Sequence, residues 1–490
     1  MHVLRFTQKM MQFLPNNTIN RRFSEALLLL VAGVLIWTPL SAQSTLLQRQ
    51  LAGSAFLDNA SYDMLLRLSD EAGGRWIGSA QNEQGLEILQ EELRKHGLKP
   101  RLERFSVPGW IRGNDEVRMI APSSRVFRAV ALGYVQKTPA FEADLVWANR
   151  GYSEDFDTVD VQGKVVLVTQ EKLGGHPAIL RAEVIQHARD AGARAVLFIN
   201  DKKGRMLMCG MSNFGGHPAP VPAFSLTWEE GKRLQRLLQR EVPVRMRITT
   251  ESYCTEVESA NVVCTLPGKS AETIVVGAHY DSWDIGQGSI DNGLGTAILF
   301  DVARLLQNIA PDNPRTIELV WFNGEEMGLW GSRKYVEMHA NDDIVAMVNM
   351  DMTGSPRGFS AMGNDHVLPL LNELASSLRG FDMSRGVINR AWTNSDHQPF
   401  MLAGIPTITP LGHLDKHMVE TYHDFGDTFD LVNRKYLSEA AAVVSILTVE
   451  LANRTTIPLV RRSPAETMEF LRGQNLEDRL KKQGEWEFEE

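Results

Sequence analysis

Three apolar segments in the second half of the chain end in histidine or acidic side chains. The segments cover residues 273–278, 315–323 and 344–350, and their composition is typical of buried strands. They run, in order, into His279 and Asp281, into Glu325 and Glu326, and into Asp351. Because imidazole and carboxylate groups are ligands of zinc and similar cations, the three strand ends predict a metal site.

Predicted helices alternate with these strands and set the fold class. The helical segments are 292–306, 332–338, 367–378 and 434–451, and a further short strand is expected at 405–409. Alternating strands and helices predict an α/β fold with a mostly parallel mixed sheet flanked by helices. In such sheets ligands bind beyond the carboxyl ends of the strands, which is where the histidine and the carboxylates fall.

The stretch from 107 to 250 has a different pattern of predicted elements. Short strand-like pieces with several glycines and prolines alternate with two predicted helices, 182–191 and 228–238. This pattern predicts a smaller α/β module inserted into the other domain, and we interpret it as a recognition or covering element. Upstream, residues 73–79 form a predicted loop that leads into a helix over 82–96, and packing alone explains both segments.

The first 44 residues have the pattern of a targeting signal. Basic residues precede the apolar run 26–37, and small residues at 39–43 offer a cleavage site. We predict a signal peptide over 1–42 and an exported protein, periplasmic or secreted, without a stable membrane span in its mature form. An uncleaved signal anchor is the alternative, but the apolar run is shorter than the roughly 20 residues that a membrane span needs.

These segments give a domain plan. At 490 residues the chain is too long for one ordinary core. We expect one discontinuous domain over 45–106 and 255–455, with the insert at 107–254. A charged extension follows at 456–490, and its sequence leaves open whether it is helical or disordered.

Charge and cysteine content exclude two classes of protein. The formal net charge of −9 offers no basic face to neutralise phosphates, so we expect no nucleic-acid partner. Three cysteines are too few for a disulfide-built scaffold. Cys254 and Cys264 are the closest pair in sequence, and whether they form a disulfide is left open.

The residues at the strand ends are sufficient for two cations. A pair of cations roughly 3.5–4 Å apart needs a shared carboxylate to offset their repulsion. The candidate ligands are His279, Asp291, Glu326, Asp351 and one late histidine.

The remaining acids suggest supporting roles. Glu325 and Glu326 are adjacent, so one can bind metal while the other accepts a proton from water. Asp281 is close enough in sequence to orient the imidazole of His279. The late histidine is one of His413, His417 and His423.

Six short motifs occur in the order and spacing of a known family. They are His279-Tyr280-Asp281, Asp291-Asn292-Gly293, Gly324-Glu325-Glu326, Asn349-Met350-Asp351, Ser395 to Phe400, and Tyr422-His423. Together they resemble the co-catalytic zinc exopeptidases of peptidase family M28. Residues 279–293 are especially similar to the carboxypeptidase Q-like branch of that family. Residues 73–97 look like its N-terminal loop and helix, and 107–250 look like its inserted protease-associated (PA) domain.

The resemblance implies two zinc ions per chain. One is expected on His279 and Asp351 and the other on Glu326 and His423, with Asp291 bridging them. His423 is preferred over the other late histidines because Tyr-His followed by Asp-Thr fits the family pattern.

The resemblance also implies catalytic roles. Glu325 becomes the general base, which passes a proton from the zinc-activated water to the leaving amine, and Asp281 becomes the partner that orients His279. Tyr422 stands where family aminopeptidases have a tyrosine that steadies the tetrahedral oxyanion, whereas carboxypeptidase Q-like chains lack it.

The function implied is that of an exported exopeptidase acting on peptides or dipeptides. Aminopeptidase, dipeptidase and carboxypeptidase specificity all stay open, and so does a homodimer. A catalytically inactive binding or receptor-like protein on the same fold is the alternative from another class. Such relatives lose metal ligands, and none is missing here. Another amide reaction, such as cyclisation of N-terminal glutamine, is disfavoured by the paired glutamates.

Overall fold

The computed structural model describes residues 46–171 and 179–488. The predicted signal peptide therefore lies outside the described residues. Residues 1–53 form a unit separate from 54–490, and the described part of this first unit is helical. Everything that follows concerns the second unit.

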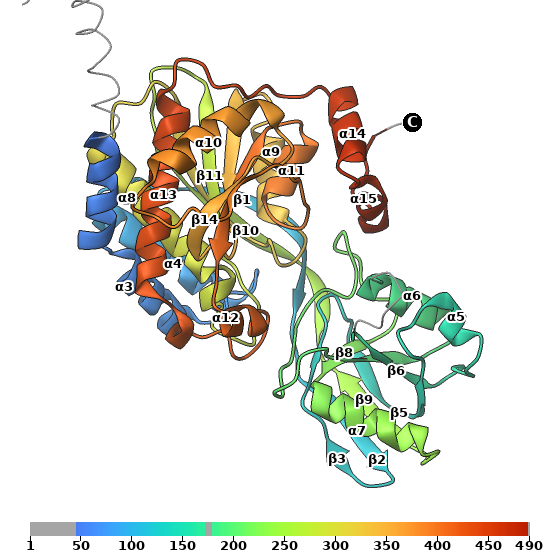
Figure 1. Ribbon diagram of the computed structural model, residues 1–490. Coiled ribbons are helices and arrows are strands. Elements are labelled where there is room, and N and C mark those ends of the chain that lie inside the picture. Colours follow the sequence, from blue (N-terminus) through green and yellow to red (C-terminus); the bar gives the residue numbers. More distant parts are fainter. Residues whose placement is uncertain (1–45, 172–178, 489–490) are drawn as a thin grey trace, which may run out of the picture. The chain divides into compact units, whose positions relative to one another are not determined.

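The three predicted strands lie side by side in the first of two sheets (Figure 1). β11 (Thr273–His279) is parallel to β12 (Thr316–Phe322) on one side and to β13 (Ile344–Asn349) on the other. Their carboxyl ends therefore meet at one edge. The sheet order is β1-β10-β12-β11-β13-β16-β14-β15. The other strands are β1 (Arg101–Ile111), β10 (Tyr253–Leu266), β14 (Ser355–Ser360), β15 (Gly386–Ile388) and β16 (Thr407–His413).

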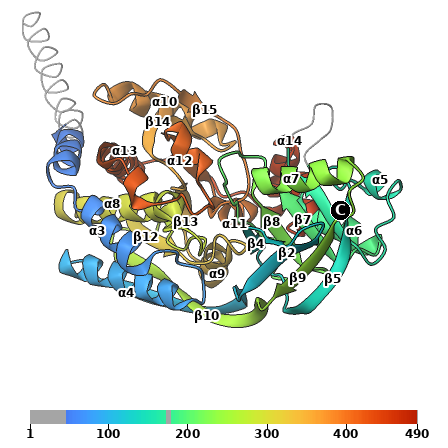
Figure 2. The same cartoon turned by 90° about the horizontal axis from the view of Figure 1, so that it is seen from below.

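Helices cover both faces of this sheet (Figures 1 and 2). α8 (Leu294–Ile309) and α13 (Arg434–Asn453) pack together on one face, near α3 (Ser61–Arg67) and α4 (Ala80–Lys95). α9 (Trp330–Met338) and α11 (His397–Leu402) lie on the other face. α10 (Leu368–Ser377) packs near β14 and β15, and α12 (Lys416–Glu420) precedes α13 in the chain.

Within the described chain, α13 alone is long and apolar enough to cross a membrane. However, 78% of its apolar window is buried inside the protein. This burial is typical of a core helix that packs on a sheet.

The second sheet is built from the central part of the chain. Its order is β3-β2-β9-β5-β6-β7-β8-β4, and β5 to β8 are parallel. The strands are β2 (Asp115–Ala121), β3 (Arg125–Val126), β4 (Ala129–Ala131), β5 (Thr138–Trp147), β6 (Val165–Thr169), β7 (Ala195–Ile199), β8 (Ala223–Leu226) and β9 (Arg245–Thr250). The helices are α5 (Ser153–Phe156), α6 (Arg181–Asp190) and α7 (Trp228–Gln239).

The two sheets share a hydrophobic core. The long strands β1 and β10 pair in an antiparallel register from Arg101 opposite Val263 to Ile111 opposite Tyr253. The buried core of the second sheet continues through Trp110 to Trp76, Trp283 and Met327, which belong to loops beside the first sheet. The inserted module is therefore packed against the loops that follow β11 and β12.

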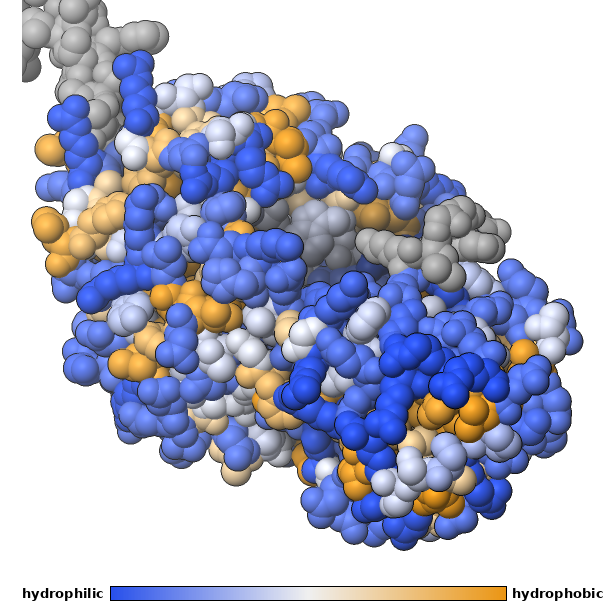
Figure 3. Space-filling view, turned by 60° about the horizontal axis from the view of Figure 1, so that its bottom comes forward, coloured by the Kyte–Doolittle hydropathy of each residue, from blue (hydrophilic) through white to orange (hydrophobic). Residues whose placement is uncertain are grey.

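The C-terminal extension is helical in its described part. α14 (Pro464–Gly473) and α15 (Glu477–Gln483) bury Leu471, Leu476 and Leu480 against Ala391 and Met401. The face drawn in Figure 3 is mostly hydrophilic, with small separate apolar patches, which is usual for a surface in contact with water.

The cysteine pair that the sequence left open is not a disulfide. All three cysteines are free. Cys254 and Cys264 lie on the same strand, β10, and about ten residues of extended chain separate them by roughly 33 Å.

Candidate metal centre

The predicted ligands come from the loops that follow the central parallel strands. His279 is the last residue of β11, and Asp351 follows β13. Asp291 lies in the turn before α8, and Glu326 lies in the loop after β12. His423 comes from the segment between α12 and α13. The edge-to-edge arrangement of β12, β11 and β13 brings these distant segments together.

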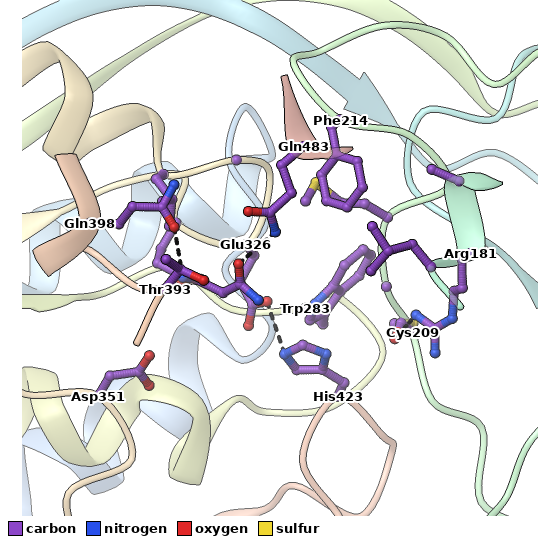
Figure 4. Close-up of a pocket in the computed structure, with 18 of the residues that line it drawn as sticks. Arg181, Cys209, Phe214, Trp283, Glu326, Asp351, Thr393, Gln398, His423 and Gln483 are labelled. Atoms are coloured by element: carbon purple, nitrogen blue, oxygen red, sulfur yellow. Dashed lines mark hydrogen bonds and ion pairs between the residues drawn. The ribbon is translucent and has the colours of Figure 1, made fainter. Parts of the chain in front are cut away.

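The ligand atoms form two groups. His279, Glu325 and Asp351 form one, and Asp291, Glu326 and His423 form the other. Within each group the donor atoms lie within 4.8 Å of one another. His423 Nε2 is 2.9 Å from Glu326 Oε2, and His279 Nε2 is 3.6 Å from Asp351 Oδ1. Figure 4 shows Glu326 above His423, with Asp351 on the other side of the site.

Asp291 lies between the two histidines. Its Oδ1 is 3.5 Å from His279 Nε2, and its Oδ2 is 3.0 Å from His423 Nε2. Each carboxylate oxygen therefore faces one imidazole. A carboxylate in this position can touch two cations at once.

The donor set fits zinc. Imidazole nitrogen and carboxylate oxygen are the ligands that zinc takes in catalytic sites. His279 Nε2 and Glu326 Oε1 are buried and have no hydrogen-bond partner among the described residues. Buried polar atoms of this kind need a partner, and a cation between the two groups would supply one.

The family of the chain follows from a comparison with known sequences. Residues 261–448 match the profile of peptidase family M28, and residues 138–234 match that of the PA domain. The predicted resemblance to peptidase family M28 is thus confirmed. The predicted α/β fold with an inserted PA domain is thus confirmed.

Named relatives of the chain include two peptidases. Carboxypeptidase Q of Bos taurus is 27% identical over 411 residues, which cover 81% of this chain and 86% of the relative. Aminopeptidase YwaD of Bacillus subtilis (strain 168) is 25% identical over 418 residues, which cover 81% of this chain and 86% of that relative.

Solved structures share the fold. A peptidase M28 precursor from Shewanella amazonensis SB2B superposes with a TM-score of 0.75 at 22% identity, covering 86% of this chain and 100% of that one. BSAP, a zinc aminopeptidase from Bacillus subtilis, superposes with a TM-score of 0.66 at 24% identity. The match covers 81% of this chain and 95% of that one.

The charges of the candidate ligands favour a bound cation. Burial raises the pKa of Glu326 to about 7 and that of Glu325 well above its usual value, although nearby imidazoles oppose both shifts. Burial lowers the pKa of His423, but the carboxylates of Glu326 and Asp291 outweigh it and raise that pKa well above the usual value. A divalent cation among these groups favours the ionised carboxylates and the neutral imidazoles.

Asp281 organises more of the site than its sequence position suggested. Its Oδ1 is 3.4 Å from His279 Nδ1, which is the expected placement beside the imidazole. In addition, its carboxylate accepts hydrogen bonds from the backbone N–H groups of Glu325, at 3.2 Å, and Glu326, at 3.3 Å. One buried carboxylate therefore contacts both the loop after β11 and the loop after β12.

Asp427 fixes the turn that carries the bridging aspartate. It accepts hydrogen bonds from the backbone N–H groups of Ile290, at 2.7 Å, and Asp291, at 3.0 Å. Burial raises the pKa of Asp427 to about 7, although these two bonds lower it. In the sequence, Asp427 is only part of the Asp-Thr pattern, because its partners are far away in the chain.

Arg75 is a positioning residue that the sequence interpretation missed. Residues 73–79 were expected only to pack, but the buried Arg75 side chain donates to four backbone carbonyls. The bonds measure 2.7 or 2.8 Å, and the acceptors are Gly73, Tyr280, Gln287 and Gly288. Arg75 therefore holds the loop between His279 and Asp291. An arginine directly before the apolar residues Trp76 and Ile77 was the available sequence signal.

The other predicted residues lie outside the two groups. His413 and His417 are exposed, as expected of rim residues. His397 is fully buried, and its two ring nitrogens lie near the Trp392 carbonyl, at 2.8 Å, and the Asn349 amide, at 3.3 Å, so its role is structural.

Tyr422 lines the pocket beside His423. The two ring centroids are 4.2 Å apart, and Lys202 Nζ of the insert lies 4.7 Å from the centre of the Tyr422 ring. The Tyr422 hydroxyl makes no hydrogen bond to a described residue. It is therefore available to a ligand.

A pocket of about 670 Å³ opens onto the candidate metal ligands. The peptidase sheet contributes Glu325, Glu326 and Asp351 to its wall. The insert contributes Arg181, Cys209 and Phe214, and the C-terminal extension contributes Arg479, Gln483 and Glu485. Three parts of the chain therefore line the site (Figure 4).

Proposed function

We propose that this M28 metallopeptidase is a di-zinc exopeptidase that removes N-terminal residues from peptides or splits dipeptides. The observation that carries the proposal is the position of Asp291, which presents one carboxylate oxygen to each of two histidines. His279 and Asp351 would hold one ion, and Glu326 and His423 the other. Zinc in such a site supplies Lewis-acid activation of water and of the scissile carbonyl.

Glu325 is the proposed general base. It lines the pocket, and its Oε2 lies 4.0 Å from His279 Nε2, so it reaches the centre of the site. The carboxylate of Asp281 accepts a hydrogen bond from the Glu325 backbone N–H, and this bond fixes the position of the Glu325 backbone. In this position Glu325 accepts a proton from the attacking water and returns it to the leaving amine. Glu326 is turned toward His423 instead.

Tyr422 is the proposed donor to the oxyanion. Its free hydroxyl and its place in the pocket wall, next to His423, suit a hydrogen bond to the oxygen of the tetrahedral intermediate. This assignment favours aminopeptidase or dipeptidase activity, because the resemblance links the tyrosine to family aminopeptidases.

The size of the pocket supports an exopeptidase. A cavity of about 670 Å³ is in the range of a small ligand rather than of a long peptide groove. The insert and the C-terminal extension each supply part of the wall. We therefore propose that only the end of a peptide enters.

The domain plan and the export of the protein belong to the same proposal. We propose a peptidase domain over 45–106 and 255–455, an insert over 107–254 and an extension over 456–490. A signal peptide over 1–42 would direct export. Carboxypeptidase specificity and an inactive binding protein remain the alternatives. Against the second, the predicted metal ligands lie in two groups of donor atoms, with His279, Asp291 and Glu326 buried and Asp351 and His423 partly buried.

Substrate profiling of the zinc-loaded protein tests the function. The substrates are alanine p-nitroanilide, Ala-Ala and N-acetyl-Ala-Ala. We expect cleavage of the first, the second or both, and no cleavage of the N-blocked peptide. Glu325→Gln is the matched control for a contaminating peptidase, because its activity should be lost. Cleavage restricted to the N-blocked peptide would indicate a carboxypeptidase, and inactivity on all three would contradict the proposal.

A further inference from the structure

The C-terminal extension and the segment before α11 meet in one part of the pocket wall. Gln483, the last residue of α15, lines the pocket, and so does Thr393 from the segment between β15 and α11. The two residues are only 7% and 6% exposed. In Figure 4 both side chains point toward the middle of the pocket. Neither residue takes part in the proposed catalytic steps.

Each of these two side chains has a polar atom without a protein partner. The Thr393 hydroxyl and Gln483 Oε1 are buried and make no hydrogen bond to a described residue. A buried polar group destabilises a folded protein when nothing pairs with it. Valine in place of threonine, or methionine in place of glutamine, would fill the same space without that penalty. Two such groups in a pocket wall are explained by a ligand that pairs with them.

The neighbouring side chains fix the orientation of the Gln483 amide. Its Nε2 donates a hydrogen bond to Asn394 Oδ1 at 2.7 Å. The backbone N–H of Asn394 donates in turn to Gln398 Oε1 at 2.8 Å. Because Nε2 of Gln483 is engaged in this way, Oε1 is the amide atom left for a ligand. The wall therefore offers one acceptor, the Gln483 carbonyl oxygen, and one donor, the Thr393 hydroxyl.

The extension is anchored to both of its neighbours. Gln474 Oε1, at the end of α14, accepts a hydrogen bond from the Ala391 N–H at 3.0 Å. Buried leucines of the extension pack against the same segment and against α11. On the other side, Lys482 of α15 pairs with Glu183 of the insert at 2.9 Å. Because α15 is held from both sides, the Gln483 amide has a fixed position in the pocket wall.

We propose that Thr393 and Gln483 form a subsite that binds an amide group of the substrate. The inference rests on the proposed function, because it needs the scissile bond to lie at the metal centre. An amide has a carbonyl oxygen, which accepts from the Thr393 hydroxyl, and an N–H group, which donates to Gln483 Oε1. One ligand group therefore pairs with both side chains. The amide is either the peptide unit that follows the scissile bond or the carboxamide side chain of the N-terminal residue.

Three substrates test the assignment. Alanine β-naphthylamide has only the scissile amide, Ala-Ala-amide adds a backbone amide after it, and glutamine β-naphthylamide adds a side-chain carboxamide. Thr393→Val removes the hydroxyl and keeps the shape of the side chain, and Gln483→Met removes the amide at similar length. In both variants we expect kcat/KM for an amide-bearing substrate, relative to that for alanine β-naphthylamide, to fall at least about five-fold, mainly through KM.

The result identifies the source of the amide. A fall for Ala-Ala-amide assigns the backbone amide, and a fall for glutamine β-naphthylamide assigns the side chain. Thr407→Val is the matched control, because the Thr407 hydroxyl is also buried without a partner in the described structure but does not line the pocket. It should leave the relative kcat/KM values unchanged. Thr393→Ser keeps the hydroxyl and should restore most of the wild-type preference.

Two outcomes would overturn the inference. One is a relative kcat/KM for the amide-bearing substrates that stays at the wild-type value in Thr393→Val or in Gln483→Met. The other is a zinc-loaded wild type that cleaves alanine β-naphthylamide but neither of the amide-bearing substrates. Thr393→Ala and Gln483→Ala replace variants that do not fold. If the zinc-loaded wild type cleaves none of the three substrates, the proposed function itself fails.

Discussion

Asp291 and His423 face each other in the metal centre, with Asp291 Oδ2 3.0 Å from His423 Nε2. The other oxygen of Asp291 is directed to His279. The aspartate does not hold this position alone, because Asp427 binds its backbone N–H. The centre therefore depends on a turn that is fixed from a distant loop, and the predictions below follow from this arrangement.

Glu325→Gln separates catalysis from metal binding. The amide keeps the size of the side chain but cannot accept the proton. We expect zinc content to stay at the wild-type level while kcat falls at least about 100-fold. Metal analysis and steady-state kinetics on the same preparation check both. Loss of zinc in this variant would show that Glu325 is a ligand rather than the base.

Glu326→Ala should weaken zinc binding, in contrast to Glu325→Gln. Glu326 Oε2 lies 2.9 Å from His423 Nε2, so its removal takes a ligand from one of the two groups. We expect the variant to lose zinc on dialysis under conditions in which Glu325→Gln retains it. Equal retention in both variants would contradict the division of roles between the adjacent glutamates.

Arg75→Met tests the buried support of the loop. The substitution leaves four carbonyl acceptors without their charged donor. We expect the free energy of unfolding to fall by about 3 to 5 kcal/mol, because each buried carbonyl left without a donor costs about 1 kcal/mol or more. Denaturant unfolding measures the loss.

Arg67→Met is the matched control for Arg75. Arg67 pairs with Glu71, Glu91 and Glu92 near the surface of the neighbouring helices. Its loss should cost about 1 kcal/mol or less, because surface ion pairs contribute little. Similar losses for Arg75→Met and Arg67→Met would mean that Arg75 does not support the loop.

His339 gives the fold a pH-dependent contribution. Its Nε2 lies 3.0 Å from Glu103 and its Nδ1 lies 2.6 Å from Asp342. The hydrogen bond with Glu103, the largest cause, and that with Asp342 raise the pKa of His339 to about 9 although burial lowers it. Because the folded pKa lies above the unfolded value of 6.5, the stabilisation is complete below pH 6.5 and is lost as the pH rises through 9.

The variant His339→Gln measures the contribution of the protonated imidazole to the free energy of unfolding. The wild type should exceed the variant in unfolding free energy by roughly 3 kcal/mol at pH 6. The difference should shrink as the pH rises to 9 and above. Denaturant unfolding at several pH values gives the curve. A difference that stays constant over this range would exclude the protonated imidazole as its cause.

The sequence predicted the elements whose pattern is local. The apolar runs at 273–278, 315–323 and 344–350 became β11, β12 and β13 within one or two residues, because each is a buried strand with a clear polar end. Since parallel neighbours share their carboxyl edge, the grouping of their polar ends could be expected too.

Features that depend on distant partners were not predictable. Arg75 binds the carbonyl of Tyr280, a partner 205 residues away in the sequence. The pairing of β1 with β10 joins segments on either side of the insert, and the burial pattern of β10 changes along its length.

The number of zinc ions bound by the wild type and by Asp291→Ala tests the central claim most directly. Both full-length proteins are dialysed against the same zinc buffer and analysed for metal per chain. The shared carboxylate predicts two zinc ions per wild-type chain and the loss of both from Asp291→Ala, because each proposed ion takes Asp291 as a ligand. A wild type that saturates at one ion, or an Asp291→Ala variant that retains two, would contradict the account.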